Sequence, residues 1–307
     1  MDPAPSTYAQ RAKVVVIVGP TAAGKSALAM FLAKRFNGEI VSADASQVYA
    51  GMDIGTSKAT QADQAAVPHH LVDITTPAEP ITLAEWQRRA QVALADIIAL
   101  GKIPILVGGT GLYISSIIEN YQLPDSQPNA ALRKNLERHT ADSLFGQLAK
   151  IDPRTAATID RHNKRRLIRA LEHALSTGSS FHETQKKQPT EYEFLIIGCN
   201  LEATALTERI NERVIAMLLA GLEREVKGLV RKYSWRATPF KAIGYKEWHD
   251  YLQRRAKLVD VITAIQRNTR RLAKRQMTWF RKLNRKHYIH WVHNTADAIP
   301  LVRSFLK

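Results

Sequence analysis

The chain has 307 residues, of which 45% are hydrophobic and 23% charged, so it holds enough apolar mass for a folded core and is not intrinsically disordered. Its length suits one large domain or two smaller ones. Lys and Arg number 44 against 28 Asp and Glu, a formal net charge of +16. Such an excess favours a polyanionic partner, above all nucleic acid, over a merely basic surface.

A single cysteine, Cys199, excludes a disulfide framework and a Cys-rich zinc site, and it suits a reducing environment. The first dozen residues contain no apolar stretch typical of a secretory signal. No apolar run approaches the roughly 18 residues of a membrane span. These features predict a cytoplasmic protein without membrane association.

The first third of the chain alternates short β-branched runs with helical patterns. Strands are expected at 13–18, 39–43, 71–74 and 103–107. One helix is expected to follow Lys25, with Leu28, Phe31, Leu32 and Phe36 on one side, and another at 83–100. Strands that alternate with helices predict a parallel sheet covered on both faces.

The pattern changes near residue 121. The stretch 121–193 shows only helical periodicity and many charges, whereas 194–200 is again strand-like. Two long helices, at 205–232 and 254–285, and a last strand at 288–292 complete the expected elements. The predicted fold class is α/β, with a parallel-sheet core formed by 1–120 and 194–307 and an all-helical insertion domain at 121–193.

Residues 19–26, GPTAAGKS, match the phosphate-loop pattern G-x-x-x-x-G-K-[ST] between an expected strand and an expected helix. The glycines let consecutive backbone amides point inward as an anion nest, and the helix N-terminus adds partial positive charge. Lys25 supplies a full charge, and Ser26 can offer its hydroxyl to Mg²⁺ on a phosphate. The predicted diphosphate-binding residues are Gly19, Pro20, Thr21, Ala22, Ala23, Gly24, Lys25 and Ser26.

This loop indicates a polyphosphate or diphosphate ligand without specifying a nucleotide. A nucleotide hydrolase or kinase normally has another strand that ends in a metal-holding Asp. Here the strand at 103–107 ends in the glycine-rich stretch 108–111, and Asp73 is expected inside its strand. The NTPase interpretation is therefore weakened. The stretch 108–111 is either a loop that closely approaches a ligand or an ordinary turn.

Asp44 follows the second expected strand, at the edge of a parallel sheet where ligands bind. The phosphate loop leaves the first strand at the same edge, so Asp44 is expected to lie near it. A carboxylate there would repel a bound diphosphate unless it performs proton chemistry or holds metal. The alternative is an Asp that caps a turn.

Seven motifs in order extend across most of the chain: GPTAAGKS (19–26), DASQVYAGMDIGTSK (44–58), PHHLVDI (68–74), ILVGGTGLYI (105–114), RRLIRALE (165–172), IGYKE (243–247) and TRRLAKRQMTWFR (269–281). In combination they resemble the bacterial tRNA dimethylallyltransferases. Two positions depart from that pattern, because Ala45 stands where many members have Ser and Ser57 where Ala is usual. The single cysteine excludes the C-terminal zinc finger of eukaryotic relatives.

The resemblance implies transfer of a dimethylallyl group from dimethylallyl diphosphate to N6 of an adenosine, giving N6-(dimethylallyl)adenosine and diphosphate. The adenosine lies beside the anticodon, at position 37 of tRNAs that read codons beginning with U. The resemblance also implies a P-loop NTPase-like core and a helical insertion domain that binds the tRNA anticodon stem-loop. We expect a monomer with no obligate protein partner.

The resemblance further assigns roles to single residues. Asp44 corresponds to a general base that anchors the adenine, Thr21 lies at the diphosphate, and Arg213, with Arg209 as the alternative, neutralises the leaving group. The implied cofactor is Mg²⁺, held through Ser26. The implied tRNA contacts are Asp44, Ala45, Ser46, Gln47, Thr110, Arg133, Arg165, Arg166, Leu167, Ile168, Arg169, Lys241, Ala242, Ile243, Gly244, Tyr245 and Lys246.

The implied chemistry suits these residue types. An exocyclic adenine amine is a poor nucleophile, but attack on the allylic carbon makes its proton acidic. A carboxylate with the ordinary aspartate pKa of about 3.9 can then accept that proton. Diphosphate departs well only if its growing charge is neutralised, which the loop amides, Lys25 and Mg²⁺ would do. Arg209 and Arg213 are four residues apart and share a helical face, although each is alternatively a solvated or ion-paired surface residue.

The segment 254–286 contains 12 Lys and Arg against one acid, Asp260. Side chains expected to face the core are Leu258, Ile262, Ile265, Leu272, Trp279 and Leu283. A second stripe, formed by Arg267, Arg271, Lys274 and Arg281, is expected to follow RNA phosphates, the alternative being a solvated face. Trp279 and Phe280 are candidates for stacking on a base, although their spacing favours the core. The insertion contributes further basic residues for RNA binding, namely Arg161, Lys164, Arg165, Arg166 and Arg169.

Other functions explain only part of this pattern. A P-loop kinase or NTPase accounts for GPTAAGKS but not for the charge, and a non-catalytic RNA-binding protein leaves the loop and Asp44 without a role. Prenyl transfer to free AMP or ADP would make the basic insertion superfluous. His69 and His70 are not expected to bind metal, because adjacent side chains on a strand point to opposite faces.

Overall fold

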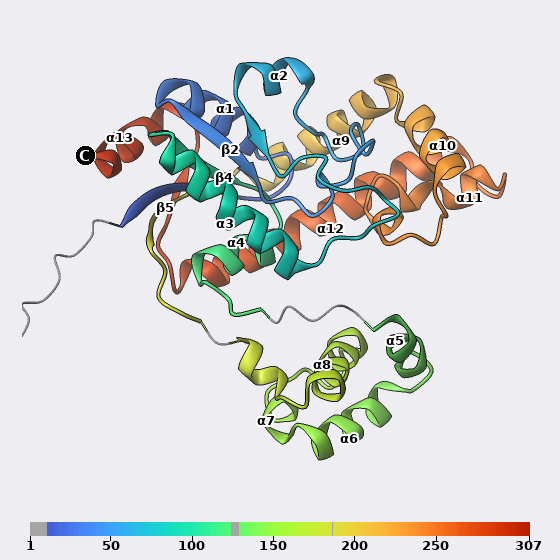
Figure 1. Cartoon of the computed structure of the whole chain (residues 1–307). Helices are drawn as coiled ribbons and strands as arrows, with labels where there is room; N and C mark the ends of the chain where they lie inside the picture. Colours follow the sequence, from blue (N-terminus) through green and yellow to red (C-terminus); the bar gives the residue numbers. More distant parts are fainter. Residues whose placement is uncertain (1–10, 124–128, 186) are drawn as a thin grey trace, which may run out of the picture. The chain divides into compact units, whose positions relative to one another are not determined.

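A six-stranded parallel sheet is the frame of the larger part of the chain (Figure 1). The computed structural model describes residues 11–123, 129–185 and 187–307. In these residues the strand order is β3-β2-β4-β1-β5-β6, and every pair of neighbouring strands is parallel. The strands are β1 (Ala12–Val18), β2 (Gly38–Ser42), β3 (His69–His70), β4 (Ile103–Val107), β5 (Tyr192–Cys199) and β6 (Ile289–Val292). The predicted α/β class and parallel sheet are confirmed.

The central strand explains why its sequence is a continuous apolar run. All five residues from Val14 to Val18 have no exposed surface, because β1 lies between β4 and β5 and both of its faces are covered. Val16 lies opposite Leu106 on one side and Ile196 on the other. Apolar residues of β1 therefore lie next to apolar residues of both neighbouring strands in the middle of the sheet.

Helices cover the sheet on both faces. Val15 and Ile17 share a core with α1 (Lys25–Arg35) and α13 (Thr295–Leu306). The alternate residues of β1 point to the other face, where α3 (Leu83–Ala99) and α4 (Gly111–Ile118) lie (Figure 1). There the Trp86 ring stacks on the Tyr113 ring, with centroids 4.1 Å apart.

The remaining helices of the sheet-containing part include two long ones, α9 (Ala203–Leu219) and α12 (Leu258–Asn284), and several shorter ones. The shorter ones are α2 (Gln61–Ala66), α10 (Leu222–Lys232), η2 (Thr238–Lys241), η3 (Lys246–Trp248) and α11 (His249–Leu252). The expected single helix at 205–232 is wrong, because the chain turns at Gly221, whose φ of 99° is a left-handed conformation. The last long helix begins at Leu258 rather than at residue 254.

The third expected strand is also wrong. The paired residues are His69 and His70, and the stretch 71–74 is a turn in which Leu71 and Asp73 have positive φ values of 63° and 55°. Phe31 was expected in the core but is 39% exposed, because small Ala29 and Ala33 complete the buried face of α1 instead.

The described residues divide into two compact units. The first holds the sheet and comprises 11–82, 86–118 and 190–307; the second comprises 83–85, 119–123, 129–185 and 187–189. The insertion was expected to extend to residue 193, whereas β5 already begins at Tyr192. No helix in the described ranges is both long and apolar enough to cross a membrane.

The second unit is helical. Its elements are α5 (Ala130–Leu136), α6 (Ala141–Ile151), α7 (Pro153–Ala156), α8 (Lys164–Thr177) and the 3₁₀ turn η1 (Phe181–Gln185). Leu144, Leu148, Leu167 and Leu171 are fully buried in its small core. Because this core is small, polar interactions carry a larger share of the unit's stability.

Asp152 is the main polar anchor of the second unit. Its buried carboxylate accepts hydrogen bonds from Thr155 N–H and Oγ1, from Ser180 Oγ and from Phe181 N–H. Burial alone would raise its pKa, but these hydrogen bonds outweigh burial and lower the pKa of Asp152. The stabilisation is therefore present at neutral pH and is lost as acid protonates the carboxylate.

We expect Asp152→Ala to destabilise the second unit by about 2–4 kcal/mol, because several buried donors lose their acceptor. Hydrogen exchange of amides in α6, α7 and α8 should accelerate correspondingly. Asp142→Ala is the control, since its carboxylate is exposed and pairs with exposed Arg161 at 3.2 Å, a kind of contact that contributes little to stability. Equal protection in the two variants would contradict the anchoring role.

Candidate active site

Three loops leave adjacent strands at the carboxyl edge of the sheet. The phosphate loop follows β1, Asp44 follows β2, and the stretch 108–111 follows β4, which lies between β1 and β2. Thr110 joins two of them, because its Oγ1 accepts a hydrogen bond from Ala45 N–H at 3.0 Å. The sheet order therefore places the phosphate loop and Asp44 on either side of one short loop.

The phosphate loop leads into the N-terminus of α1, which has no side-chain cap. Gly24 caps this helix in a left-handed conformation, with φ of 91° and no side-chain cap, and no acidic residue lies in the first turn. Lys25 donates a hydrogen bond from Nζ to Pro20 O at 2.7 Å, which folds its ammonium group back over the loop. Backbone amides and this cation together suit a phosphate group.

Two cavities meet at Arg213. The first, of about 390 Å³, is lined by Gly24, Lys25, Ser26, Arg209 and Arg213 among others. The second, of about 560 Å³, is lined by Thr21, Asp44, Thr110 and again Arg213. Three cationic side chains and the carboxylate of Glu212 line the first cavity, whose excess of positive charge suits a diphosphate. The carboxylate of Asp44 lines the second cavity.

Charges at this junction influence one another. The pKa of Lys25 is lowered to about 8, mainly because the side chain is buried. Cys199 and Asp44 act to raise this pKa, whereas Arg213 acts to lower it. Burial also lowers the pKa of Arg213, against the attraction of Asp44. Burial raises the pKa of the Cys199 thiol to about 11. Lys25 and Arg213 therefore lie close together beside Asp44, and Glu212 also lines the first cavity. A bound anionic ligand would offset the repulsion between the two cations.

Asp44 is only partly engaged by its own loop. Its Oδ1 accepts a hydrogen bond from Ser46 N–H at 2.8 Å, the contact expected of a turn-capping Asp. The carboxylate also lines the second cavity. It thus combines the turn-capping role with exposure to a ligand, so that the two interpretations of Asp44 do not exclude each other.

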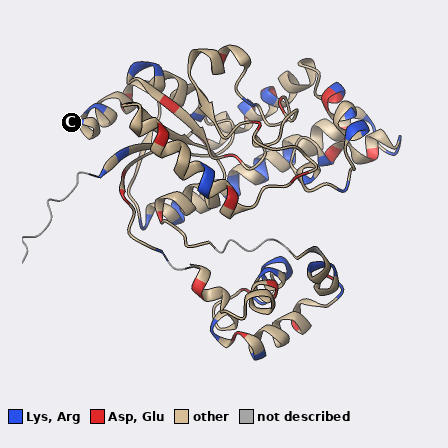
Figure 2. Ribbon diagram, in the orientation of Figure 1, with Lys and Arg blue, Asp and Glu red and all other residues tan. Residues whose placement is uncertain are grey.

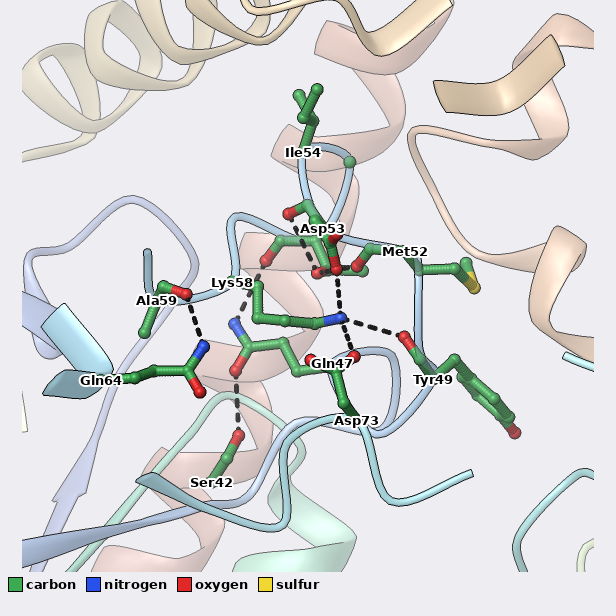
Figure 3. Close-up of polar contacts among 12 residues, drawn as sticks. Ser42, Gln47, Tyr49, Met52, Asp53, Ile54, Lys58, Ala59, Gln64 and Asp73 are labelled. Carbon is green, nitrogen blue, oxygen red and sulfur yellow. Dashed lines mark hydrogen bonds and ion pairs between the residues drawn. The ribbon is translucent and has the colours of Figure 1, made fainter. Parts of the chain in front are cut away.

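The chain after Asp44 is held by side chains of its own (Figure 3). Gln47 accepts from Ser42 Oγ at 2.9 Å and donates to Thr56 O at 3.2 Å, and Lys58 bridges the carboxylates of Asp53 and Asp73. Gln47 was expected to contact tRNA, whereas here its amide supports this loop.

A second anchor for the same loop comes from α10. The Glu225 carboxylate accepts hydrogen bonds from the backbone amides of Asp53, Ile54 and Gly55 at 2.7–3.1 Å, and from Tyr245 Oη at 2.7 Å. Ser57 then accepts a hydrogen bond from Arg213 Nε at 2.7 Å. Ser57, one of the two positions at which the sequence departs from the pattern it resembles, therefore orients the candidate catalytic Arg.

Two residues of α12 line the second cavity, of which Gln276 was missed as a site residue and Trp279 was considered for base stacking but assigned to the core. Gln276 accepts from Thr21 N–H at 2.8 Å and donates to Gly109 O at 3.0 Å, so it joins the phosphate loop to the loop after β4. Trp279 was expected in the core but is 41% exposed and lines the second cavity, whereas Phe280 is fully buried. The spacing of Leu272, Gln276 and Trp279 on one helical face was the available signal.

The expected RNA-binding residues of the first unit include several exposed cations. Lys241 and Lys246 are exposed and line the second cavity, with Gly244 and Tyr245 buried between them. Arg267, Arg271, Lys274 and Arg281 are exposed on α12, as predicted (Figure 2). Leu258 was expected in the core but is 37% exposed.

In the second unit the expected contacts differ in accessibility. Arg165 and Arg166 are exposed in the first turn of α8, while Leu167 and Ile168 are buried in the core. Arg133 donates to the buried carboxylate of Glu172 at 2.8 Å, and Arg169 lies 3.6 Å from it. Cations at the positive end of a helix are unfavourable unless an anion binds there, so this turn favours phosphate contact.

No group of three or more His, Cys, Asp or Glu side chains in the described residues is placed to hold a metal ion. His70 instead pairs with Glu39 at 2.6 Å, and His69 Nδ1 lies 2.8 Å from Val67 O. Ser26 is exposed in the first cavity. A hydroxyl of this kind fits Mg²⁺, which keeps several waters and binds chiefly through substrate phosphates.

Comparison with known proteins agrees with this geometry. A family model described as IPP transferase matches residues 47–283, and a model described as isopentenyl transferase matches residues 12–80. The chain belongs to the IPP transferase family. The confirmed resemblance covers the phosphate loop, the Asp44 loop and the basic α12.

Individual relatives match nearly the whole IPP transferase chain. The tRNA dimethylallyltransferase of Roseiflexus sp. (strain RS-1) is 46% identical over 275 residues, 88% of this chain and 90% of that protein. The tRNA dimethylallyltransferase of Anoxybacillus flavithermus is 44% identical over 289 residues, 94% and 92% of the two chains.

Solved structures share the fold. The tRNA isopentenylpyrophosphate transferase of Bacillus halodurans is 40% identical, with a TM-score of 0.70 over 96% of this chain and 95% of that chain. A eukaryotic dimethylallyltransferase acting on tRNA is 30% identical, with a TM-score of 0.79 over 92% and 74%.

The pKa of about 8 for Lys25 predicts the pH dependence of diphosphate binding. The ammonium form binds the anion, so affinity for dimethylallyl diphosphate should weaken by up to tenfold per pH unit above pH 8. The substrate phosphates are ionised already, since a phosphate ester loses its second proton near pH 6, about two units lower. Calorimetric titration from pH 7 to pH 10 measures this.

Lys25→Met is the matched variant. It should bind weakly at every pH and show a flat profile over this range. A profile in Lys25→Met that parallels the natural protein would show that another group titrates.

Proposed function

We propose that this IPP transferase transfers the dimethylallyl group of dimethylallyl diphosphate to N6 of adenosine 37 in tRNAs that read codons beginning with U. The observation that carries the proposal is the position of Arg213, which lines both the phosphate-loop cavity and the cavity that holds Asp44. A diphosphate on one side of this Arg and an adenine on the other would bring the reacting atoms together.

The leaving group is stabilised on the phosphate-loop side. The bond that breaks joins the allylic carbon to the diphosphate oxygen, and negative charge accumulates on the departing diphosphate. In our proposal the N-terminus of α1, the Lys25 ammonium and the Arg213 guanidinium neutralise it. Ser57 orients Arg213 through the hydrogen bond to Nε, which leaves the other guanidinium nitrogens for phosphate oxygens.

The base acts on the other side. As N6 of adenine forms its bond to the allylic carbon, the amine becomes cationic and must lose one proton. Asp44 lines the cavity that Arg213 shares, and its carboxylate is the acceptor in our proposal. Thr110 and Ser46 hold the loop that positions this carboxylate.

Mg²⁺ is the proposed cofactor. Bound to the substrate phosphates and Ser26, it would neutralise part of their charge. The residues fit this role because Ser26 is exposed at the mouth of the phosphate loop.

The RNA partner is supported by charge in both units. Arg267, Arg271, Lys274 and Arg281 form one exposed stripe, and Arg165 and Arg166 lie at the start of α8. Taking the adenine out of its stack in the anticodon loop costs a few kcal/mol, which such phosphate contacts would offset. The proposal includes a cytoplasmic location and a monomeric enzyme. Sedimentation of the purified protein would test the oligomeric state.

One assay decides the function. The protein is incubated with labelled dimethylallyl diphosphate and unmodified tRNA, AMP or ADP, and separately with γ-labelled ATP. Label recovered on tRNA supports the proposal. Label on free nucleotide, or phosphate transfer from ATP, would replace it with one of the alternatives.

Asp44→Ala should slow the chemical step at least 100-fold, because among the described residues no other carboxylate lines this cavity. Single-turnover transfer to tRNA measures this rate, and calorimetry should show that binding of dimethylallyl diphosphate survives. Wild-type turnover in this variant would remove Asp44 from the mechanism.

Affinity for tRNA should fall steeply with salt. The slope of log affinity against log salt should flatten by roughly 0.7–1 for each phosphate contact removed. Arg267→Gln with Arg271→Gln tests the stripe, and Arg303→Gln, exposed on α13, is the control. A flat salt response of the natural protein would argue against phosphate binding.

A further inference from the structure

Trp279 is a large aromatic side chain that remains exposed inside the candidate site. It is 41% exposed, although neighbouring Phe280 on the same helix has no exposed surface. It lines the cavity of about 560 Å³ together with Asp44 and Thr110. The proposed mechanism gives this side chain no task.

The indole is held rigidly from two sides. Its Nε1 donates a hydrogen bond to Ser115 Oγ, which is buried on α4, at 3.1 Å. Its five-membered ring packs against Gly111, where an added Cβ would lie only 2.4 Å from Cδ1. A ring fixed in this way would lose little conformational freedom when a ligand stacks on it.

The surroundings of the ring favour RNA over the prenyl chain. Arg275 lines the same cavity and lies one helical turn away from Trp279 on α12, where it is exposed. Another apolar part of the lining, formed by Ile210, Val214 and Met217, lies on α9, the helix that also carries Arg213. Because the prenyl chain would be attached to a diphosphate at Arg213, we assign that part of the lining to the prenyl chain and Trp279 to the base.

We propose that the exposed face of the Trp279 indole is a stacking platform for a nucleobase of the RNA substrate, at the mouth of the cavity that contains Asp44. This inference rests on the proposed function, because it takes RNA as the substrate. Base stacking on an aromatic residue contributes enough for its removal to weaken binding several-fold to more than tenfold.

The test compares Trp279→Ala and Trp279→Phe with Trp291→Phe, a control on β6 whose ring packs over Gly198 and does not line the cavity. Binding of an anticodon stem-loop RNA and of dimethylallyl diphosphate is measured separately for each. We expect Trp279→Ala to weaken RNA binding roughly 5- to 100-fold, Trp279→Phe to retain most of it, and diphosphate binding to stay unchanged in all variants.

Tryptophan fluorescence gives a readout that a purely structural role would not produce. RNA should quench the emission of Trp291→Phe, and the quenching should be lost in Trp279→Phe. Unaltered quenching in Trp279→Phe, or RNA binding by folded Trp279→Ala equal to that of the control, would overturn the proposal. Selective loss of dimethylallyl diphosphate binding would assign the ring to the prenyl chain instead.

The two proposals fail differently. If the natural protein transfers no label to tRNA, the proposed function fails whatever Trp279 does. If transfer occurs and Trp279 variants match the control, only the stacking platform is wrong. Should Trp279→Ala not fold, the fluorescence of Trp279→Phe decides.

Discussion

Repulsion between two cations, Lys25 and Arg213, is the constraint on which the candidate site depends. Each has a pKa lowered by burial, and Asp44 is the carboxylate that attracts both. Such an arrangement is unfavourable in the free protein and becomes favourable when a diphosphate binds. The positive charge that stabilises a departing diphosphate is therefore already in place before the substrate binds.

The scaffold that holds these charges was partly predictable from the chain. β-Branched runs before GPTAAGKS and before Asp44 predicted parallel strands, and the rule that ligands bind at the carboxyl edge placed both loops together. Phe31 and Trp279 were misplaced because helical period alone does not say which neighbour covers each face. The turn at Asp73 escaped prediction because its fixing partner, Lys58, lies 15 residues away in the sequence.

Long-range polar contacts account for most of what the sequence did not reveal. Gln276 contacts the phosphate loop across 255 residues of sequence, and Ser57 meets Arg213 across 156. No local pattern encodes such pairs. Two local signals were missed as well, because no helix was predicted at α2 or α13, although Thr60 and Asn294 each form a capping box there.

Gly221 gives the corner between α9 and α10 an importance that neither cavity reveals. Helix α9, which precedes Gly221, carries Arg213. Helix α10, which follows it, carries Glu225, whose carboxylate accepts backbone hydrogen bonds from the loop that contains Ser57. A side chain at this left-handed position would strain the corner and tilt the two helices out of alignment. A substitution of Gly221 is thus expected to lower activity, although this residue lines neither cavity.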